Sequence, residues 1–113
     1  MGYQMYKVIH SETARKDVDN LVAYMIYSLK NYQAASNFFN LYDKQISNLK
    51  IFPYAYRDIG YEYQGYKIHI KPFSTYNIFY VVDETTHQII ILRILKNRQD
   101  WRNIMYYVND FSF

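Results

Sequence analysis

Three runs of β-forming residues stand close together in the second half of the chain, and they limit the possible folds more than any other part of the sequence. The runs are Tyr66–Lys71, Tyr76–Val82 and His87–Leu95. Short turn-forming clusters at 72–75 and 83–86 separate them. β-Rich runs joined by such short turns are typical of antiparallel strands that follow one another in a sheet. The sequence therefore predicts a three-stranded meander.

The first of these runs alternates strictly between apolar and basic side chains. Ile68 and Ile70 fall on one face of the predicted strand, while Lys67, His69 and Lys71 fall on the other. If the isoleucine face is buried, the basic face lies in solvent. We therefore expect an open sheet face that carries these three basic side chains, which makes it a candidate binding surface. The simpler interpretation is an edge strand whose lysines prevent edge-to-edge aggregation.

Two amphipathic helices are predicted in the first half of the chain. An apolar stripe at helical spacing supports a helix over Ala14–Leu29, and Ser11 is a suitable N-cap. A second stripe supports a helix over Ala35–Leu49, which ends before Pro53. Because the link between the helices is short, they are expected to form an antiparallel hairpin that covers the apolar face of the sheet.

The remaining segments complete the predicted order of elements. Weak alternation over Tyr3–His10 predicts a first strand, and apolar spacing from Trp101 to Val108 predicts a short terminal helix. The tyrosine-rich stretch from Pro53 to Gly65 is expected to be a surface loop held by its aromatic rings. The predicted order is β-α-α-β-β-β-α, an α+β fold in which a helical hairpin packs on one face of a small antiparallel sheet.

Composition narrows the class of protein. With 113 residues the chain has room for one domain, 1–113, and a hydrophobic content of 50% excludes a disordered chain. The sequence contains no apolar run long enough to cross a membrane and no signal-peptide pattern, so we expect a cytoplasmic protein. There is no cysteine, the histidines lack partners at ligand spacing, and three glycines leave no phosphate-binding loop. No metal or other cofactor is therefore expected.

Positive charge is concentrated in the meander and the segment that follows it. The net charge of +3 is only a hint of a polyanionic partner. The helical region from Ser11 to Lys50 is nearly balanced, whereas bases outnumber acids between Tyr66 and Arg102. The bases there are Lys67, Lys71, Arg93, Lys96, Arg98 and Arg102, against Asp83, Glu84 and Asp100. Solvation of a terminal helix is an equally good explanation for Arg98 and Arg102.

Three segments carry a resemblance to a known family. They read LKIFPY at 49–54, YNIFYVVDE at 76–84 and ILRILKNRQDW at 91–101. In this order and spacing the chain, from Tyr6 to about Ile104, resembles the RelE/ParE superfamily, the toxins of bacterial type II toxin–antitoxin modules, which include plasmid stabilisation systems. The resemblance implies a microbial-RNase-like sheet with a helical hairpin packed against it.

The resemblance implies one of two activities. RelE-like toxins enter the ribosomal A site and cleave mRNA, whereas ParE-like toxins inhibit DNA gyrase and need no nuclease site. Lys67 and His69 match the basic pair that RelE-like toxins carry on the second strand, and Arg98 matches the arginine after the last strand. Asn77 stands where a third-strand arginine is expected, and Ile104 falls near an expected tyrosine. Lys67, His69 and Arg98 together favour mRNA cleavage. Gyrase inhibition and a degenerate member that only binds are the alternatives.

Under the mRNA-cleavage hypothesis the protein is a metal-independent endoribonuclease. The RNA 2′-hydroxyl attacks the adjacent phosphate and leaves a cyclic phosphate and a free 5′-hydroxyl. His69 is expected to act as the base, because an imidazole titrates near neutrality. Lys67 and Arg98 are expected to stabilise charge on the phosphate. Tyr106 or Tyr107 is the candidate acid for the leaving oxygen, and the other expected RNA contacts are Lys71, Lys96, Arg102 and Tyr106.

The resemblance also implies a protein partner. A toxin of this kind is kept harmless by an antitoxin whose C-terminal segment wraps the toxin and covers its basic surface. An acidic, partly disordered partner would suit a domain of charge +3, because folding on binding lets a short chain cover a large area. We therefore expect a toxin–antitoxin hetero-oligomer, with the ribosome and mRNA, or DNA gyrase, as the further partner.

Overall fold

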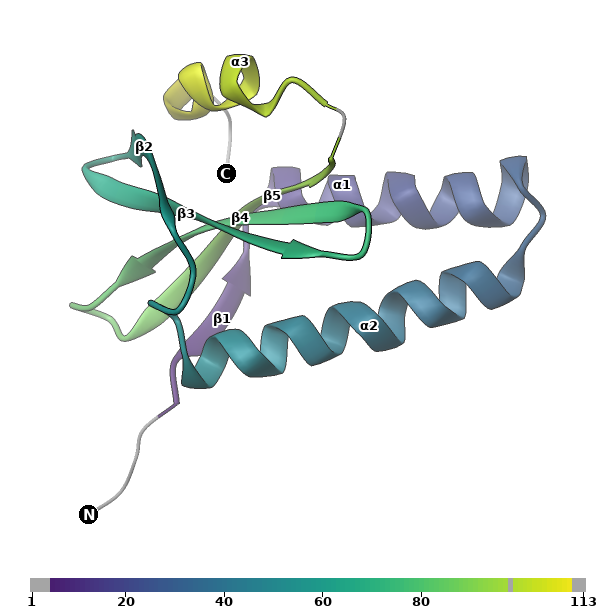
Figure 1. The fold of residues 1–113 in the computed structure, drawn as a ribbon, viewed down its shortest axis with the longest axis horizontal. Helices are drawn as coiled ribbons and strands as arrows, with labels where there is room; N and C mark the ends of the chain where they lie inside the picture. The colour runs from purple at the N-terminus through teal and green to yellow at the C-terminus, as the bar shows by residue number, and fades with distance from the viewer. Residues whose placement is uncertain (1–4, 98, 111–113) are drawn as a thin grey trace.

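The fold is an α+β sandwich built around one five-stranded sheet (Figure 1). The computed structural model describes residues 5–97 and 99–110. Strand order in the sheet is β1-β5-β4-β3-β2. The first strand pairs parallel to β5, and all other neighbours are antiparallel, which confirms the predicted meander. The strands are β1 (Lys7–His10), β2 (Asp58–Tyr63), β3 (Tyr66–Phe73), β4 (Tyr76–Asp83) and β5 (Gln88–Lys96).

The helical hairpin forms where the apolar stripes predict it. Helix α1 (Glu12–Ala23) continues into a π-helical turn (Tyr24–Ser28), and α2 (Tyr32–Ile51) follows. The Ser11 hydroxyl accepts a hydrogen bond from the Ala14 amide at 3.0 Å, which confirms the predicted cap. Near the C-terminus, α3 (Trp101–Tyr106) is followed by a short 3₁₀ turn (Val108–Asp110).

The stretch expected to be a loop contains strand β2, so that prediction was wrong. Tyr63 pairs with Tyr66 across a two-residue turn in which Gln64 and Gly65 both have positive φ. A turn with two left-handed residues matches the twist of a β-hairpin. The register of β2 is irregular between Asp58 and Glu62, and Gly60 has φ +81°. This irregularity interrupts the period of two by which a strand is recognised in a sequence.

Both faces of the sheet are covered, which contradicts the expected open face. Figure 1 shows α3 above the strands and α2 below them. Ile68 and Ile70 are buried as predicted, but they lie in the core beneath α3 and not beneath the hairpin. The hairpin instead covers the face that carries His69 and Lys71. The alternation was predicted correctly, but sequence alone could not show that a six-residue helix covers the second face.

A charged pair fixes α1 on the sheet. The Asp17 carboxylate accepts hydrogen bonds from Arg93 Nε at 2.7 Å and Nη2 at 3.0 Å, and also from the Ile94 amide at 3.0 Å. Both charged side chains are largely buried. Two parallel bonds to a planar guanidinium hold the carboxylate in a defined orientation, so the pair sets the position of the helix on β5.

Candidate functional site

His69 is enclosed by aromatic rings near the end of α2. Its ring stacks on Tyr80 at 5.3 Å between centroids and meets the edge of Tyr54 at 6.0 Å. Its Nδ1 lies 2.9 Å from the carbonyl oxygen of Tyr56. Because a carbonyl only accepts, Nδ1 carries the proton, and in the neutral ring Nε2 is then the free acceptor. The His69 side chain is 9% exposed, so access to this acceptor is narrow.

Lys67 and His69 line the same hollow, of about 380 Å³, at the β2–β3 edge of the sheet. The Lys67 ammonium lies 4.0 Å from the Asp58 carboxylate, and its side chain is well exposed. An exposed pair of this kind contributes little to stability and opens easily. The other residues that line the hollow are Tyr54, Gly65, Tyr66 and Val82. The structure therefore brings two members of the predicted trio together, with a carboxylate beside them.

Lys71 is not available on the surface, contrary to expectation. It is 4% exposed, and its Nζ donates to Gln45 Oε1 of α2 at 2.5 Å. The same ammonium lies 4.4 Å from the centroid of the Tyr56 ring. A cation taken out of water needs such partners, and a hydrogen bond plus a ring face provide them. Lys71 therefore joins the hairpin to the sheet.

The other predicted RNA contacts lie on the surface but belong to different regions. Lys96 lies over the ring of Tyr24 at 5.0 Å, and Arg102 lies over the ring of Trp101 at 4.5 Å. Tyr106 is exposed on α3. The third member of the predicted catalytic trio, Arg98, lies outside the described residues.

Strand register separates the end of β5 from His69. Lys96 pairs with Tyr76 of β4, whereas His69 pairs with Tyr80. Four residues along a strand span about 13 Å. The last strand is also two strands away from β3 in the sheet. The His69 hollow and the end of β5 are therefore separate regions of the surface.

A carboxylate clamp, missed in the sequence, holds Tyr54 near His69. Glu84 Oε1 accepts hydrogen bonds from the Tyr6 hydroxyl at 2.6 Å and from the Tyr54 hydroxyl at 2.8 Å. The bond to the carboxylate raises the pKa of Tyr6 to about 12, and the two tyrosine hydroxyls lower the pKa of Glu84. The clamp joins three segments that are distant in sequence, so no local pattern predicts it. The high tyrosine content was the one sequence signal that could have suggested it.

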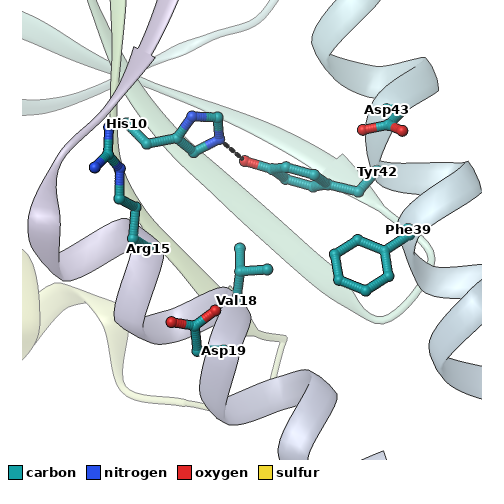
Figure 2. Close-up of a pocket in the computed structure, with 7 residues that line it drawn as sticks. All are labelled: His10, Arg15, Val18, Asp19, Phe39, Tyr42 and Asp43. Atoms are coloured by element: carbon teal, nitrogen blue, oxygen red, sulfur yellow. Dashed lines mark hydrogen bonds between the residues drawn. The ribbon is translucent and has the colours of Figure 1, made fainter.

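A further hollow, of about 320 Å³, lies between α1, α2 and the end of β1 (Figure 2). His10 Nε2 lies 2.6 Å from the Tyr42 hydroxyl, across the floor of the hollow. Burial and, to a smaller degree, the nearby Arg15 charge lower the pKa of His10, and burial raises that of Tyr42. Both groups are therefore neutral, and one hydrogen bond joins the imidazole to the hydroxyl. The other residues that line the hollow are Val18, Asp19, Phe39 and Asp43.

The described part of the chain contains neither a metal-binding cluster nor a helix that could cross a membrane. Residues 5–97 and 99–110 contain no group of three or more histidine, aspartate or glutamate side chains placed to hold a metal ion. Over the same residues, no helix is both long enough and apolar enough to cross a membrane.

Comparison with known proteins identifies the family. The family model for the ParE toxin of the type II toxin–antitoxin system parDE matches residues 8–101. The chain belongs to the ParE toxin family. It is therefore a toxin of a type II toxin–antitoxin system, and the resemblance to the RelE/ParE superfamily is confirmed.

The fold of this ParE-family toxin is also found in a solved structure. It is similar to a chain of the toxin–antitoxin complex RelBE2 from Mycobacterium tuberculosis, with a TM-score of 0.55 and 19% sequence identity. The match covers 81% of this toxin and 98% of that chain. At this identity the likeness supports the shared fold alone. None of the curated proteins matches the sequence.

Proposed function

We propose that this ParE-family toxin stops growth by binding and inhibiting DNA gyrase, without cutting RNA. The observation that supports this most is the enclosure of His69, the expected base, which is 9% exposed. A general base must come within about 3 Å of the 2′-hydroxyl proton that it removes. The described cations at the end of β5 belong to a different region, and Asn77 replaces the third-strand arginine. A gyrase inhibitor needs none of these groups in a catalytic arrangement.

Cleavage of mRNA is the second candidate function, and one arrangement of side chains favours it. Lys67 and His69 share a hollow, and His69 Nε2 is the acceptor that a base requires. In this hypothesis His69 takes the 2′-hydroxyl proton, while Lys67 and Arg98 stabilise the phosphate charge. Opening of Tyr54 would be needed to admit the RNA, because that ring lies against His69.

The two candidates are separated by one induction experiment. After induction of the toxin, gyrase-dependent DNA breaks and the 5′ ends of mRNA are measured in the same culture. We expect breaks without cleaved messages, and we expect His69→Phe and Arg98→Ala to arrest growth like the wild type. The phenylalanine keeps a ring against Tyr80 and removes the base. Cleaved messages that disappear in both variants, with the fold intact by circular dichroism, would establish RNA cleavage instead.

We also propose an antitoxin as the direct protein partner. Membership of a toxin–antitoxin family supports it, as does the fold shared with a chain of RelBE2, itself a toxin–antitoxin complex. Co-expression with the adjacent small open reading frame should restore growth and yield a stable hetero-oligomer. Growth arrest that no adjacent gene relieves would count against this partner.

A further inference from the structure

A hollow of about 430 Å³ lies on the α3 side of the sheet and is distinct from the His69 hollow. Arg57 lines it from the segment before β2, Asn77 from β4, Asn97 from the end of β5 and Trp101 from α3. Tyr56 adds a second aromatic wall. Residues that are far apart in sequence thus present one guanidinium, two amides and two aromatic rings to the same space.

The side chain of Asn77 reaches this hollow without a hydrogen-bond partner among the described residues. Asn77 is 8% exposed, and its amide forms no hydrogen bond with any residue that the structure describes. Every fully enclosed side-chain nitrogen or oxygen of the described residues has a hydrogen-bond partner. The unpaired Asn77 amide is therefore not fully enclosed, and its remaining exposure is toward the hollow that it lines. Buried amides are normally paired. An amide left open at the wall of a hollow is therefore a candidate for binding a ligand.

Arg57 gives the hollow a positive character. Its side chain is exposed, and no acid among the described residues lies within ion-pair distance of its guanidinium. None of the residues that line the hollow is acidic. A guanidinium beside an amide offers several N–H donors to one anion, and a carboxylate fits that geometry.

We propose that this hollow binds a glutamate or aspartate side chain from an acidic segment of a protein partner. Arg57 pairs with the carboxylate, the Asn77 amide hydrogen-bonds the same carboxylate or the adjacent peptide group, and Trp101 contacts the aliphatic stem. This inference deepens the proposed antitoxin interaction and rests on it for the identity of the partner. It names the residues of the toxin that recognise an acidic chain.

The count of available cations favours a peptide over a nucleic acid. Binding of a nucleic acid backbone depends on several cations that neutralise successive phosphates. Arg57 is the described cation that lines this hollow, while Arg102 is stacked on the ring of Trp101. Lys71 is held by Gln45, and Lys96 lies over Tyr24. One cation beside an amide suits a single carboxylate.

Trp101 is the single tryptophan of the sequence, so its fluorescence reports on the hollow directly. The full-length toxin is titrated with an acetylated, amidated tetraglutamate peptide. Tetraglutamine, oligouridylate and inorganic phosphate serve as comparison probes. We expect a saturable change in Trp101 emission with tetraglutamate and little with the other three. Binding should weaken about tenfold or more in Arg57→Gln and in Asn77→Leu, the size expected for loss of one charge-assisted hydrogen bond or one amide contact.

Lys44→Gln is the matched control, because it removes one positive charge from an exposed position on α2. It should bind tetraglutamate like the wild type. Asn77→Ser replaces Asn77→Leu if the leucine variant does not fold by circular dichroism. Equal binding of tetraglutamate and tetraglutamine, absence of binding, or preference for oligouridylate would each overturn the proposal.

A second measurement separates this inference from the antitoxin proposal. The affinity of the toxin for the product of the adjacent open reading frame is measured for the wild type and for Arg57→Gln. A wild-type complex that weakens about tenfold in the variant supports the hollow as an anchor. A complex of unchanged affinity overturns it and leaves the antitoxin proposal standing. If the wild type binds no adjacent product, the antitoxin proposal fails, and the tetraglutamate titration still decides the chemistry of the hollow.

Discussion

At the scale of single residues, His10 shows how burial sets the state of an ionisable group. The ring shares a hydrogen bond with the Tyr42 hydroxyl, and the lowered pKa keeps the imidazole neutral in the folded protein. In the unfolded chain the same imidazole titrates near 6.5. Between that pH and the lower folded value, the unfolded chain binds a proton that the folded protein does not. Stability therefore falls as the pH drops through this window.

Replacement of His10 tests this linkage. We expect His10→Gln to lose less stability than the wild type between pH 7.5 and pH 5.5, measured as the change in Tm. Tyr42→Phe is the matched control, because it keeps the buried ring and removes only the hydroxyl. It should cost about 0.5–1.5 kcal/mol at neutral pH and retain most of the acid sensitivity. Equal acid sensitivity of the wild type and His10→Gln would show that other groups cause it.

At the scale of elements, the sequence was most informative where one period runs over many residues. The stripes of α1 and α2 and the runs of β3 to β5 predicted those elements well, because each buries a regular face. Strand β2 was missed because Gly60 interrupts its alternation. In the candidate site, the presence of Lys67 and His69 in one hollow could be expected, because both side chains lie on the same face of their strand. The enclosure by Tyr54 could not, because it depends on contacts between distant segments.

The turn that joins β2 to β3 gives a testable prediction about the strand that the sequence did not predict. Gln64 and Gly65 both have positive φ, a conformation that suits glycine and strains other residues. A Cβ at position 65 would meet no atom within 4 Å, so Gly65→Ala tests backbone strain alone. We expect it to destabilise the protein by about 1–2 kcal/mol. Gln64→Asn should be neutral or slightly stabilising, because asparagine tolerates this region. Chemical denaturation measures both, and equal effects would contradict the strain argument.

At the scale of the whole molecule, the sheet is the middle layer of three. The hairpin covers one face, and α3 with its 3₁₀ turn covers the other through Met105 and Val108. A helix of six residues therefore covers one of the two core clusters. Without this cover Ile68, Ile70 and the other apolar side chains of that face would be exposed to water.

Truncation of one side chain tests the role of α3. Met105 is buried in the core beneath α3, whereas its neighbour Tyr106 is exposed. We expect Met105→Ala to destabilise the protein by about 2–5 kcal/mol in urea denaturation. Tyr106→Ala should change the free energy of unfolding by about 0.5 kcal/mol or less. Similar values for the two variants would mean that α3 does not act as a core layer.

The parallel pairing of β1 with β5 has a consequence for synthesis of the toxin. Lys7 is in register with Gln88, and the Ser11 hydroxyl bonds the Leu92 carbonyl, 81 residues away. The first strand to leave the ribosome can join the sheet only after the last strand has followed it. A chain released before β5 is made lacks the strand with which β1 pairs, so it has no route to this fold. Growth arrest then requires translation to reach the end of β5, so prematurely terminated copies are expected to be harmless.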